Sequence, residues 1–179
     1  AIVHNGIIEN FVEIKQRLIA EYNVKFKSET DSEVIAHLIA AHMKNYSTLE
    51  DAVYAATLEM RGAYALVVVS SKDPNKIVAV RKDAPLIAGI GKGENFIASD
   101  IPALMKHCKE IYLIENGEMV VVTADEIKIY DEERNPVQRD VFHVTWDADA
   151  AEKEGYSHFM LKEIHEQPKA ISETLNRRL

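Results

Sequence analysis

An asparagine followed by a glycine, Asn5-Gly6, stands directly after the apolar residues Ile2 and Val3. Residues 1–4 are typical of a strand end, and Asn5-Gly6 predicts a sharp turn. A glycine after asparagine lets the backbone take a positive φ, so its N–H can point into a pocket beside the asparagine amide. Two such donors can stabilise a developing oxyanion. The alternative is a simple turn without chemistry, which is the usual role of an isolated Asn-Gly pair.

Asp31 is the second candidate, because it lies in the stretch Thr30-Asp31-Ser32-Glu33 at the start of an expected helix. The spacing is that of a capping box, in which Thr30 or Asp31 would accept from the first helical N–H groups. The chemical alternative is a carboxylate that holds the ammonium group of a ligand. The local sequence favours capping. Glu29 and Glu33 add nearby carboxylates, but without a second acidic cluster they do not indicate a glycosidase.

The cysteine and the histidines do not predict a nucleophile or a metal centre. Cys108 is adjacent to His107 in the sequence, and adjacent side chains point in different directions, so a buried structural thiol is expected. Two histidine pairs are spaced five and seven residues apart, which does not place both rings on one ion. These pairs are His37 with His42 and His158 with His165. The glycine-rich segment 89–93 lacks the spacing of a phosphate-binding loop and predicts a turn or bulge.

The composition is that of a single acidic globular domain. The chain has 179 residues, 47% of them hydrophobic and 28% charged, with a formal net charge of -8. An acidic balance argues against a general nucleic-acid surface, which needs clustered Lys and Arg. A single cysteine cannot form an internal disulfide, so a cytoplasmic location is expected. No apolar run is long enough to predict a membrane span, and the first residues do not form a signal peptide.

Periodicity predicts helices first and strands afterwards. Apolar residues recur at helical spacing over about 8–22, and two further helices are expected to start near Thr30 and Ser47. The β-branched run from Ala63 to Ser70 predicts a strand buried on both faces. Asp73-Pro74-Asn75 predicts a turn, and Asn116-Gly117 predicts a hairpin.

This order of elements favours an α+β architecture. Helices that cover both faces of paired antiparallel sheets would form a four-layer αββα sandwich, although periodicity alone leaves other α+β arrangements open. Near the end of the chain, Pro168 is expected to break a helical segment and to mark a domain boundary.

Five segments, in order, resemble the glutamine–fructose-6-phosphate aminotransferase family. The matching stretches are HNGIIEN (4–10), SETDSEVIAHL (28–38), RGAY (61–64), GENFIASD (93–100) and MLKEIHEQP (160–168). Each is modest alone, but the ordered set covers nearly the whole chain. The resemblance implies a glutaminase domain over residues 1–160, followed over 161–179 by an exit linker toward a sugar-isomerase domain that lies outside this chain. It also implies an N-terminal-nucleophile hydrolase-like αββα fold, incomplete at its N-terminus.

The family's mechanism gives these residues roles. An N-terminal cysteine thiol attacks the side-chain amide of glutamine. The resemblance assigns the oxyanion to the Asn5 side chain and the Gly6 N–H, and the α-ammonium group of glutamine to Asp31. Ammonia then converts fructose 6-phosphate into glucosamine 6-phosphate at the other domain. The family uses no cofactor and no metal. It also implies a homodimeric parent without nucleic-acid or membrane partners.

The sequence departs from the family in one respect. The nucleophilic cysteine and the loop that clasps the substrate lie upstream of the segments matched here, and position 1 is Ala. The isolated 179 residues are therefore expected to be inactive, and a core face is expected to be open without the first strands. Two alternatives stay open, namely the glutaminase half of another amidotransferase and a non-catalytic ligand-binding module of the same fold.

Overall fold

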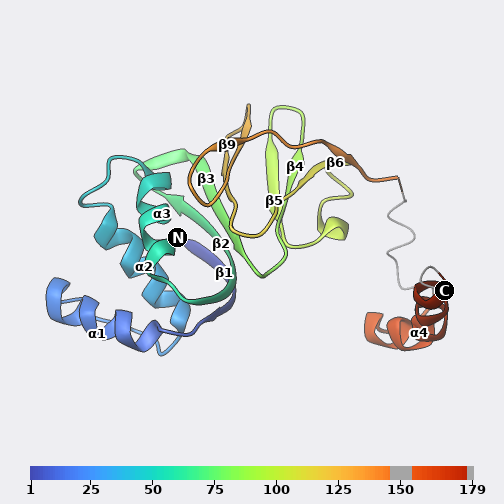
Figure 1. The fold of residues 1–179 in the computed structure, drawn as a ribbon, viewed down its shortest axis with the longest axis horizontal. Coiled ribbons are helices and arrows are strands. Elements are labelled where there is room, and N and C mark those ends of the chain that lie inside the picture. The colour runs from blue at the N-terminus through green and yellow to red at the C-terminus, as the bar shows by residue number, and fades with distance from the viewer. Residues whose placement is uncertain (146–154, 177–179) are drawn as a thin grey trace. The chain divides into compact units, whose positions relative to one another are not determined.

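A computed structural model describes residues 1–145 and 155–176. The chain divides into two compact units, Ala1–Val144 and Thr145–Leu179, each of which is considered by itself. Unit 1 contains three α-helices and all of the described strands (Figure 1). The predicted division between a glutaminase domain (1–160) and an exit linker (161–179) concerns function, and it stays a prediction.

The three helices of unit 1 are α1 (Phe11–Tyr22), α2 (Asp31–His42) and α3 (Leu49–Glu59). The apolar spacing predicted all three. On α3, Thr48 is the N-cap and accepts a hydrogen bond from the N–H of Asp51. The predicted capping box at α2 is wrong, because Thr30 makes no side-chain cap. Glu33 turns instead to the preceding loop, where its carboxylate accepts from the N–H groups of Lys27 and Ser28 at 2.8 and 2.6 Å.

The strands form two sheets in which every pairing between strands is antiparallel. The six-stranded sheet has the order β1-β2-β3-β7-β8-β9 and the four-stranded sheet the order β10-β6-β4-β5. Their bounds are β1 Ile2–Ile8, β2 Gly62–Ser70, β3 Asp73–Lys82, β4 Ile87–Ile90, β5 Asn95–Ala98, β6 Glu110–Leu113, β7 Met119–Val122, β8 Ile127–Tyr130, β9 Pro136–Val137 and β10 Phe142–His143.

Alternation along β3 shows how the layers are built. Val78 and Val80 belong to the core beneath the helices, and Ala79 belongs to a second core between the two sheets. Helices α1–α3 lie together on one side of β1–β3 (Figure 1). The outer face of β4 is covered by the segment after the short 3-10 helix η1 (Ile101–Ala103), because Leu104 and Cys108 lie directly against Gly89. The predicted α+β class with two antiparallel sheets is confirmed.

The Asn-Gly pair at 116–117 forms a turn but not a hairpin. Gly117 has a φ of +81°, as such a turn requires. However, the preceding strand β6 belongs to the four-stranded sheet and the following strand β7 to the six-stranded sheet. The predicted turn at Asp73-Pro74-Asn75 is also wrong, because these residues begin β3 and the reversal lies just before them.

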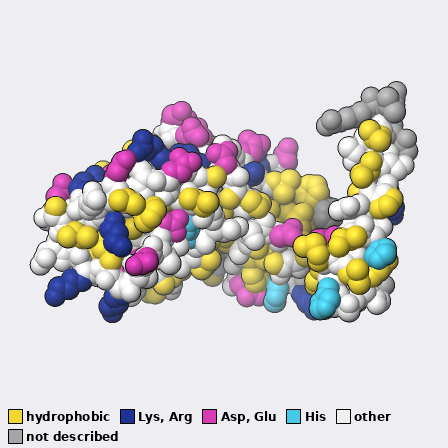
Figure 2. Space-filling model, turned by 90° about the horizontal axis from the view of Figure 1, so that it is seen from below, with side chains coloured by type: hydrophobic (Ala, Val, Ile, Leu, Met, Phe, Trp, Pro, Cys, Tyr) yellow, Lys and Arg dark blue, Asp and Glu magenta, His cyan; other side chains and the backbone are white. Residues whose placement is uncertain are grey.

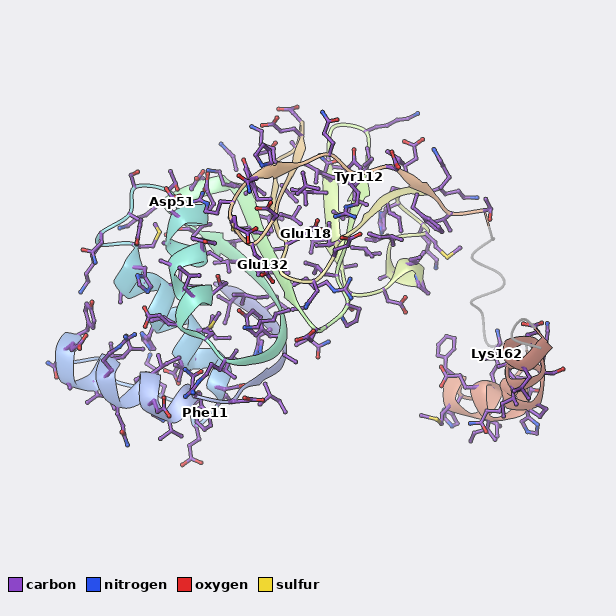
Figure 3. The ribbon with its side chains drawn as sticks, in the orientation of Figure 1. Phe11, Asp51, Tyr112, Glu118, Glu132 and Lys162 are labelled. Atoms are coloured by element: carbon purple, nitrogen blue, oxygen red, sulfur yellow. The ribbon has the colours of Figure 1, made fainter. Side chains whose placement is uncertain are left out.

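A buried ion pair holds this connection between the sheets. Glu118 is 5% exposed and lies within the sheet-bearing part of unit 1 (Figure 3). Its carboxylate accepts from the N–H of Glu115 at 2.6 Å and from the guanidinium group of Arg139. Removing either charged partner would leave the other with little access to water, so the pair is costly to break.

Unit 2 contains α4 (Phe159–Asn176), which runs through Pro168. The predicted break at Pro168 is therefore wrong, because the loss of one backbone donor is tolerated among good helix formers. Apolar side chains gather on the surface of this helical unit (Figure 2). They include Phe159, Met160, Ile164, Ile171 and Leu175, each more than half exposed. Among the described residues, no helix is long and apolar enough to span a membrane.

Candidate functional site

Strand β1 is an edge of the six-stranded sheet, and its odd-numbered residues turn their backbone polar groups to β2. The terminal amine of Ala1 donates to the carbonyl of Val69 at 2.8 Å, and the N–H of Glu9 donates to the carbonyl of Arg61 at 2.8 Å. Backbone groups alternate in direction along an antiparallel strand. The N–H groups of the even-numbered residues, including Gly6 and Ile8, are therefore directed to the open edge.

Asp31 meets this edge at the start of α2. Its Oδ2 atom accepts from the N–H of Ile8 at 2.9 Å, and its Oδ1 atom lies 3.8 Å from Nδ1 of His4. The Asp31 side chain is 23% exposed. Asp31 is the first residue of α2, and the N-terminus of a helix favours nearby negative charge. The Oδ2 atom is thus bound to the strand, and the Oδ1 atom is left as the acceptor for a ligand. Asp31 bonds to β1 and not to the N–H groups of its own helix.

Gly6 adopts a conformation that other residues rarely adopt. Its φ is +135°, and a Cβ atom at this position would lie 2.1 Å from the carbonyl oxygen of Ala63 and 2.7 Å from Cα of Tyr64. The predicted positive φ is confirmed, but the predicted turn is wrong, since β1 continues to Ile8. The reason is that Gly6 takes an extended, mirror-image conformation that keeps the strand running and brings its backbone close to β2.

Asn5 is exposed on the strand beside Gly6. Its side-chain amide makes no hydrogen bond to any residue that the structure describes. The amide is therefore available to donate to a ligand at the same part of β1. Side chains at positions 4 and 5 point to opposite faces of the strand, so Asn5 lies on the side away from the helices.

The sequence interpretation missed His4 and Ser32. The His4 side chain is only 2% exposed, and its Nδ1 atom lies 2.9 Å from Oγ of Ser32. Its Nε2 atom is buried and has no hydrogen-bond partner among the described residues. The sequence did hold a signal for His4, because side chains alternate between the two faces of a strand. His4 therefore shares the helix-facing side of β1 with the apolar residues Ile2 and Ile8.

The remaining candidates lie elsewhere. Cys108 is buried, as predicted, and burial raises the pKa of its thiol. Within residues 1–145 and 155–176, no cluster of three or more His, Cys, Asp or Glu side chains could hold a metal ion. A cavity of about 330 Å³ lies between α3, β3 and the turn after β8, with Tyr64, Arg81 and Glu132 in its wall. It includes neither Asn5, Gly6 nor Asp31.

The sequence matches a known domain class. Residues 1–106 match the glutamine amidotransferase domain family, and the chain belongs to that family. The chain is also 52% identical over 179 residues to the glutamine–fructose-6-phosphate aminotransferase (isomerizing) of Clostridium tetani, and 54% identical over 179 residues to that of Clostridium perfringens. It is 50% identical over 175 residues to the enzyme of the same name from Methanothermobacter thermautotrophicus. These alignments cover 98–100% of the chain but only 29% of each relative.

A solved structure confirms the fold. The glutamine phosphoribosylpyrophosphate amidotransferase of B. subtilis, complexed with ADP and GMP, aligns with a TM-score of 0.61 and 24% identity. The alignment covers 76% of this chain and 30% of that chain. At this identity the likeness concerns the fold alone, and it agrees with the predicted N-terminal-nucleophile type of two-sheet sandwich.

Proposed function

We propose that the chain is the glutamine-hydrolysing part of a glutamine–fructose-6-phosphate aminotransferase. The observation that carries the proposal is the hydrogen bond from the N–H of Ile8 to Asp31. This bond ties the carboxylate to the strand that holds Asn5 and Gly6. Support for the particular enzyme comes from relatives of that name, which are 50–54% identical over nearly all of the chain.

In the proposed complex, glutamine lies along the open edge of β1. Its ammonium group binds Oδ1 of Asp31, and its side-chain carbonyl accepts from the Asn5 amide and the Gly6 N–H. Successive residues in a strand advance about 3.4 Å, so the N–H groups of Gly6 and Ile8 lie roughly 7 Å apart. The ammonium nitrogen and side-chain carbonyl oxygen of an extended glutamine lie roughly 6 Å apart by standard bond lengths. The substrate therefore spans the two sites.

The rest of the reaction in this proposal uses groups outside the 179 residues. The attacking thiol is an N-terminal cysteine of the full-length protein, and its amine acts as the base. Cys108 does not supply the thiol, because it is buried against Gly89. The ammonia released passes to a separate domain that binds fructose 6-phosphate. The full-length protein is proposed to be a cytoplasmic homodimer without nucleic-acid or membrane partners.

Glutamate release by the full-length protein that contains this chain tests the site. Asn5→Ala removes one oxyanion donor and should lower kcat by about 10²–10³-fold, with little change in KM. Asp31→Asn should raise the KM for glutamine instead, because it weakens a contact to the substrate ammonium group. Asn45→Ala is the matched control, since Asn45 is also exposed and its side chain bonds to no described residue. Wild-type kcat in Asn5→Ala would contradict the proposed oxyanion site.

Assays with different ammonia acceptors distinguish the proposed enzyme from the two alternatives, which are another amidotransferase and a non-catalytic ligand-binding module. Formation of glucosamine 6-phosphate from glutamine and fructose 6-phosphate supports the proposed enzyme. Turnover with phosphoribosyl pyrophosphate instead would assign the chain to the other amidotransferase. A full-length protein that binds glutamine without releasing glutamate would indicate the non-catalytic module.

A further inference from the structure

The side chain of His4 is buried and lies between the two parts of the proposed glutamine site. It precedes Asn5 on β1, and its ring faces the first turn of α2, where Asp31 and Ser32 lie. The side chain is 2% exposed, so packing restricts the ring to one position. Burying a polar imidazole ring costs free energy unless the ring makes hydrogen bonds, so the contacts of His4 need an explanation.

Two hydrogen bonds connect β1 to the start of α2. Ile8 donates from its backbone to Oδ2 of Asp31 at 2.9 Å, and the Nδ1 atom of His4 pairs with Oγ of Ser32 at 2.9 Å. Packing of Val34 and Ile35 against the core holds α2 near β1, and the bond from Ile8 fixes one oxygen of the Asp31 carboxylate. The bond between His4 and Ser32 adds a second contact at the adjacent helical residue, which fixes the direction of the Asp31 carboxylate.

The hydrogen-bond pattern also indicates which nitrogen of the His4 ring is the donor. Nε2 is buried and has no partner in the described part of the chain. Orphaned buried N–H groups are rare, whereas unpaired acceptors are somewhat less so. The arrangement in which Nδ1–H donates to the hydroxyl oxygen of Ser32 is therefore favoured. The same edge of the ring faces Oδ1 of Asp31 at 3.8 Å, so the ring also limits rotation of the carboxylate.

We propose that His4 is a positioning residue that acts through Ser32 and Asp31. It fixes the start of α2 against β1, and so sets the separation between the ammonium-binding carboxylate and the oxyanion donors. This role rests on the proposed function, because it requires glutamine to contact both Asp31 and the Asn5-Gly6 pair. His4 itself touches no substrate atom.

Substitutions that mimic one ring nitrogen at a time test this role in the full-length protein. The amide of asparagine reaches about as far as Nδ1, whereas that of glutamine reaches about as far as Nε2. His4→Gln should raise the KM for glutamine by about 3–10-fold, the equivalent of one hydrogen bond, with kcat within about twofold of wild type. His4→Asn should restore a KM near wild type. Ser32→Ala should raise KM as much as His4→Gln, and the double variant should add little to either.

Controls separate positioning from general damage. Ser47→Ala is matched to Ser32→Ala, because Ser47 is exposed just before α3 and should leave KM unchanged. Melting temperatures are measured for every variant, and the smaller Ser32→Ala change keeps the test valid if His4→Gln does not fold. Additive effects of His4→Gln and Ser32→Ala on KM, or a KM as high in His4→Asn as in His4→Gln, would refute the positioning role.

The proposed function and the positioning role fail in different ways. If Asp31→Asn leaves KM unchanged, the ammonium site itself is wrong, and the role of His4 is refuted with it. If Asp31→Asn raises KM while His4→Gln and Ser32→Ala keep the wild-type value, the glutamine site stands and only the positioning role is overturned.

Discussion

Replacing Gly6 by alanine should destabilise the protein far more than a surface glycine substitution usually does. The new Cβ atom would lie 2.1 Å from the carbonyl oxygen of Ala63 and 2.7 Å from Cα of Tyr64. Both are backbone atoms of β2, so no side chain can rotate away. The φ of +135° adds a second cost, because this region is nearly restricted to glycine.

The magnitude follows from these two terms. A non-glycine residue in such a region costs about 1–3 kcal/mol. Contacts of Cβ atoms below 3.0 Å are essentially never seen, so β1 and β2 must separate by roughly 1 Å near Gly6. Such a shift weakens the neighbouring ladder hydrogen bonds, at about 0.5–1.5 kcal/mol each. The expected total is about 3–5 kcal/mol, a large part of the 5–15 kcal/mol that is typical of a whole domain.

Urea denaturation of the 179-residue chain measures this loss. Gly93→Ala is the matched control, because Gly93 has a φ of +73° but no atom lies within 4 Å of the place that its Cβ would occupy. It should lose only about 1–2 kcal/mol, for the left-handed backbone alone. Gly62→Ala should resemble Gly6→Ala, since its Cβ would lie 2.1 Å from the carbonyl oxygen of Ile7 across the same strand pair. Equal losses in Gly6→Ala and Gly93→Ala would refute the close approach of β1 and β2.

Two further predictions concern ionised carboxylates. The hydrogen bond from the Ser28 hydroxyl is the chief cause that lowers the pKa of Glu33 to about 2. The ionised Glu33 therefore stabilises the fold fully above the unfolded pKa of 4.5, and this stabilisation is lost as the pH falls toward 2. The difference in unfolding free energy between wild type and Glu33→Gln should therefore be constant above about pH 5.5 and shrink between 4.5 and 2, and a difference that grows in acid would contradict this. Glu118→Gln should cost about 2–4 kcal/mol in urea denaturation, because it leaves the Arg139 guanidinium group without its buried charged partner. Glu126→Gln, at an exposed ion pair, should change stability by less than about 1 kcal/mol, and equal effects would refute the importance of burial.

Local patterns predicted the elements better than their pairing. The helices followed from apolar spacing, and the Asn116-Gly117 turn followed from glycine's freedom at positive φ. The partners of β6 and β7 depend instead on contacts between residues far apart in sequence, which turn chemistry does not encode. The prediction of a helix break at Pro168 was wrong for a local reason, because the cost of the proline is outweighed by the helix-forming residues on either side.

The resemblance placed Asn5, Gly6 and Asp31 in one site, but the sequence did not predict the hydrogen bond from Ile8 that joins Asp31 to β1. The sequence indicated Asn5 and Gly6 as donors and left Asp31 between a helix cap and a ligand carboxylate. Strand parity decides where each backbone N–H points, and parity depends on the register of β1 against β2. That register begins with Ile2 against Val68, a pairing that no short motif in the sequence specifies.

The start of α2 supports the proposed ligand-binding role of Asp31 over a role in capping the helix. A capping side chain contributes about 1 kcal/mol to a helix start, and α3 obtains this from Thr48. At α2 the side chain of Thr30 makes no such bond, and Asp31 turns away to β1. A helix start that forgoes a cap despite carrying two suitable residues violates a local rule, and such violations concentrate at functional sites. The bond from the Ile8 N–H instead holds the Asp31 carboxylate on the strand that carries Asn5 and Gly6, which is where the proposed glutamine complex requires it.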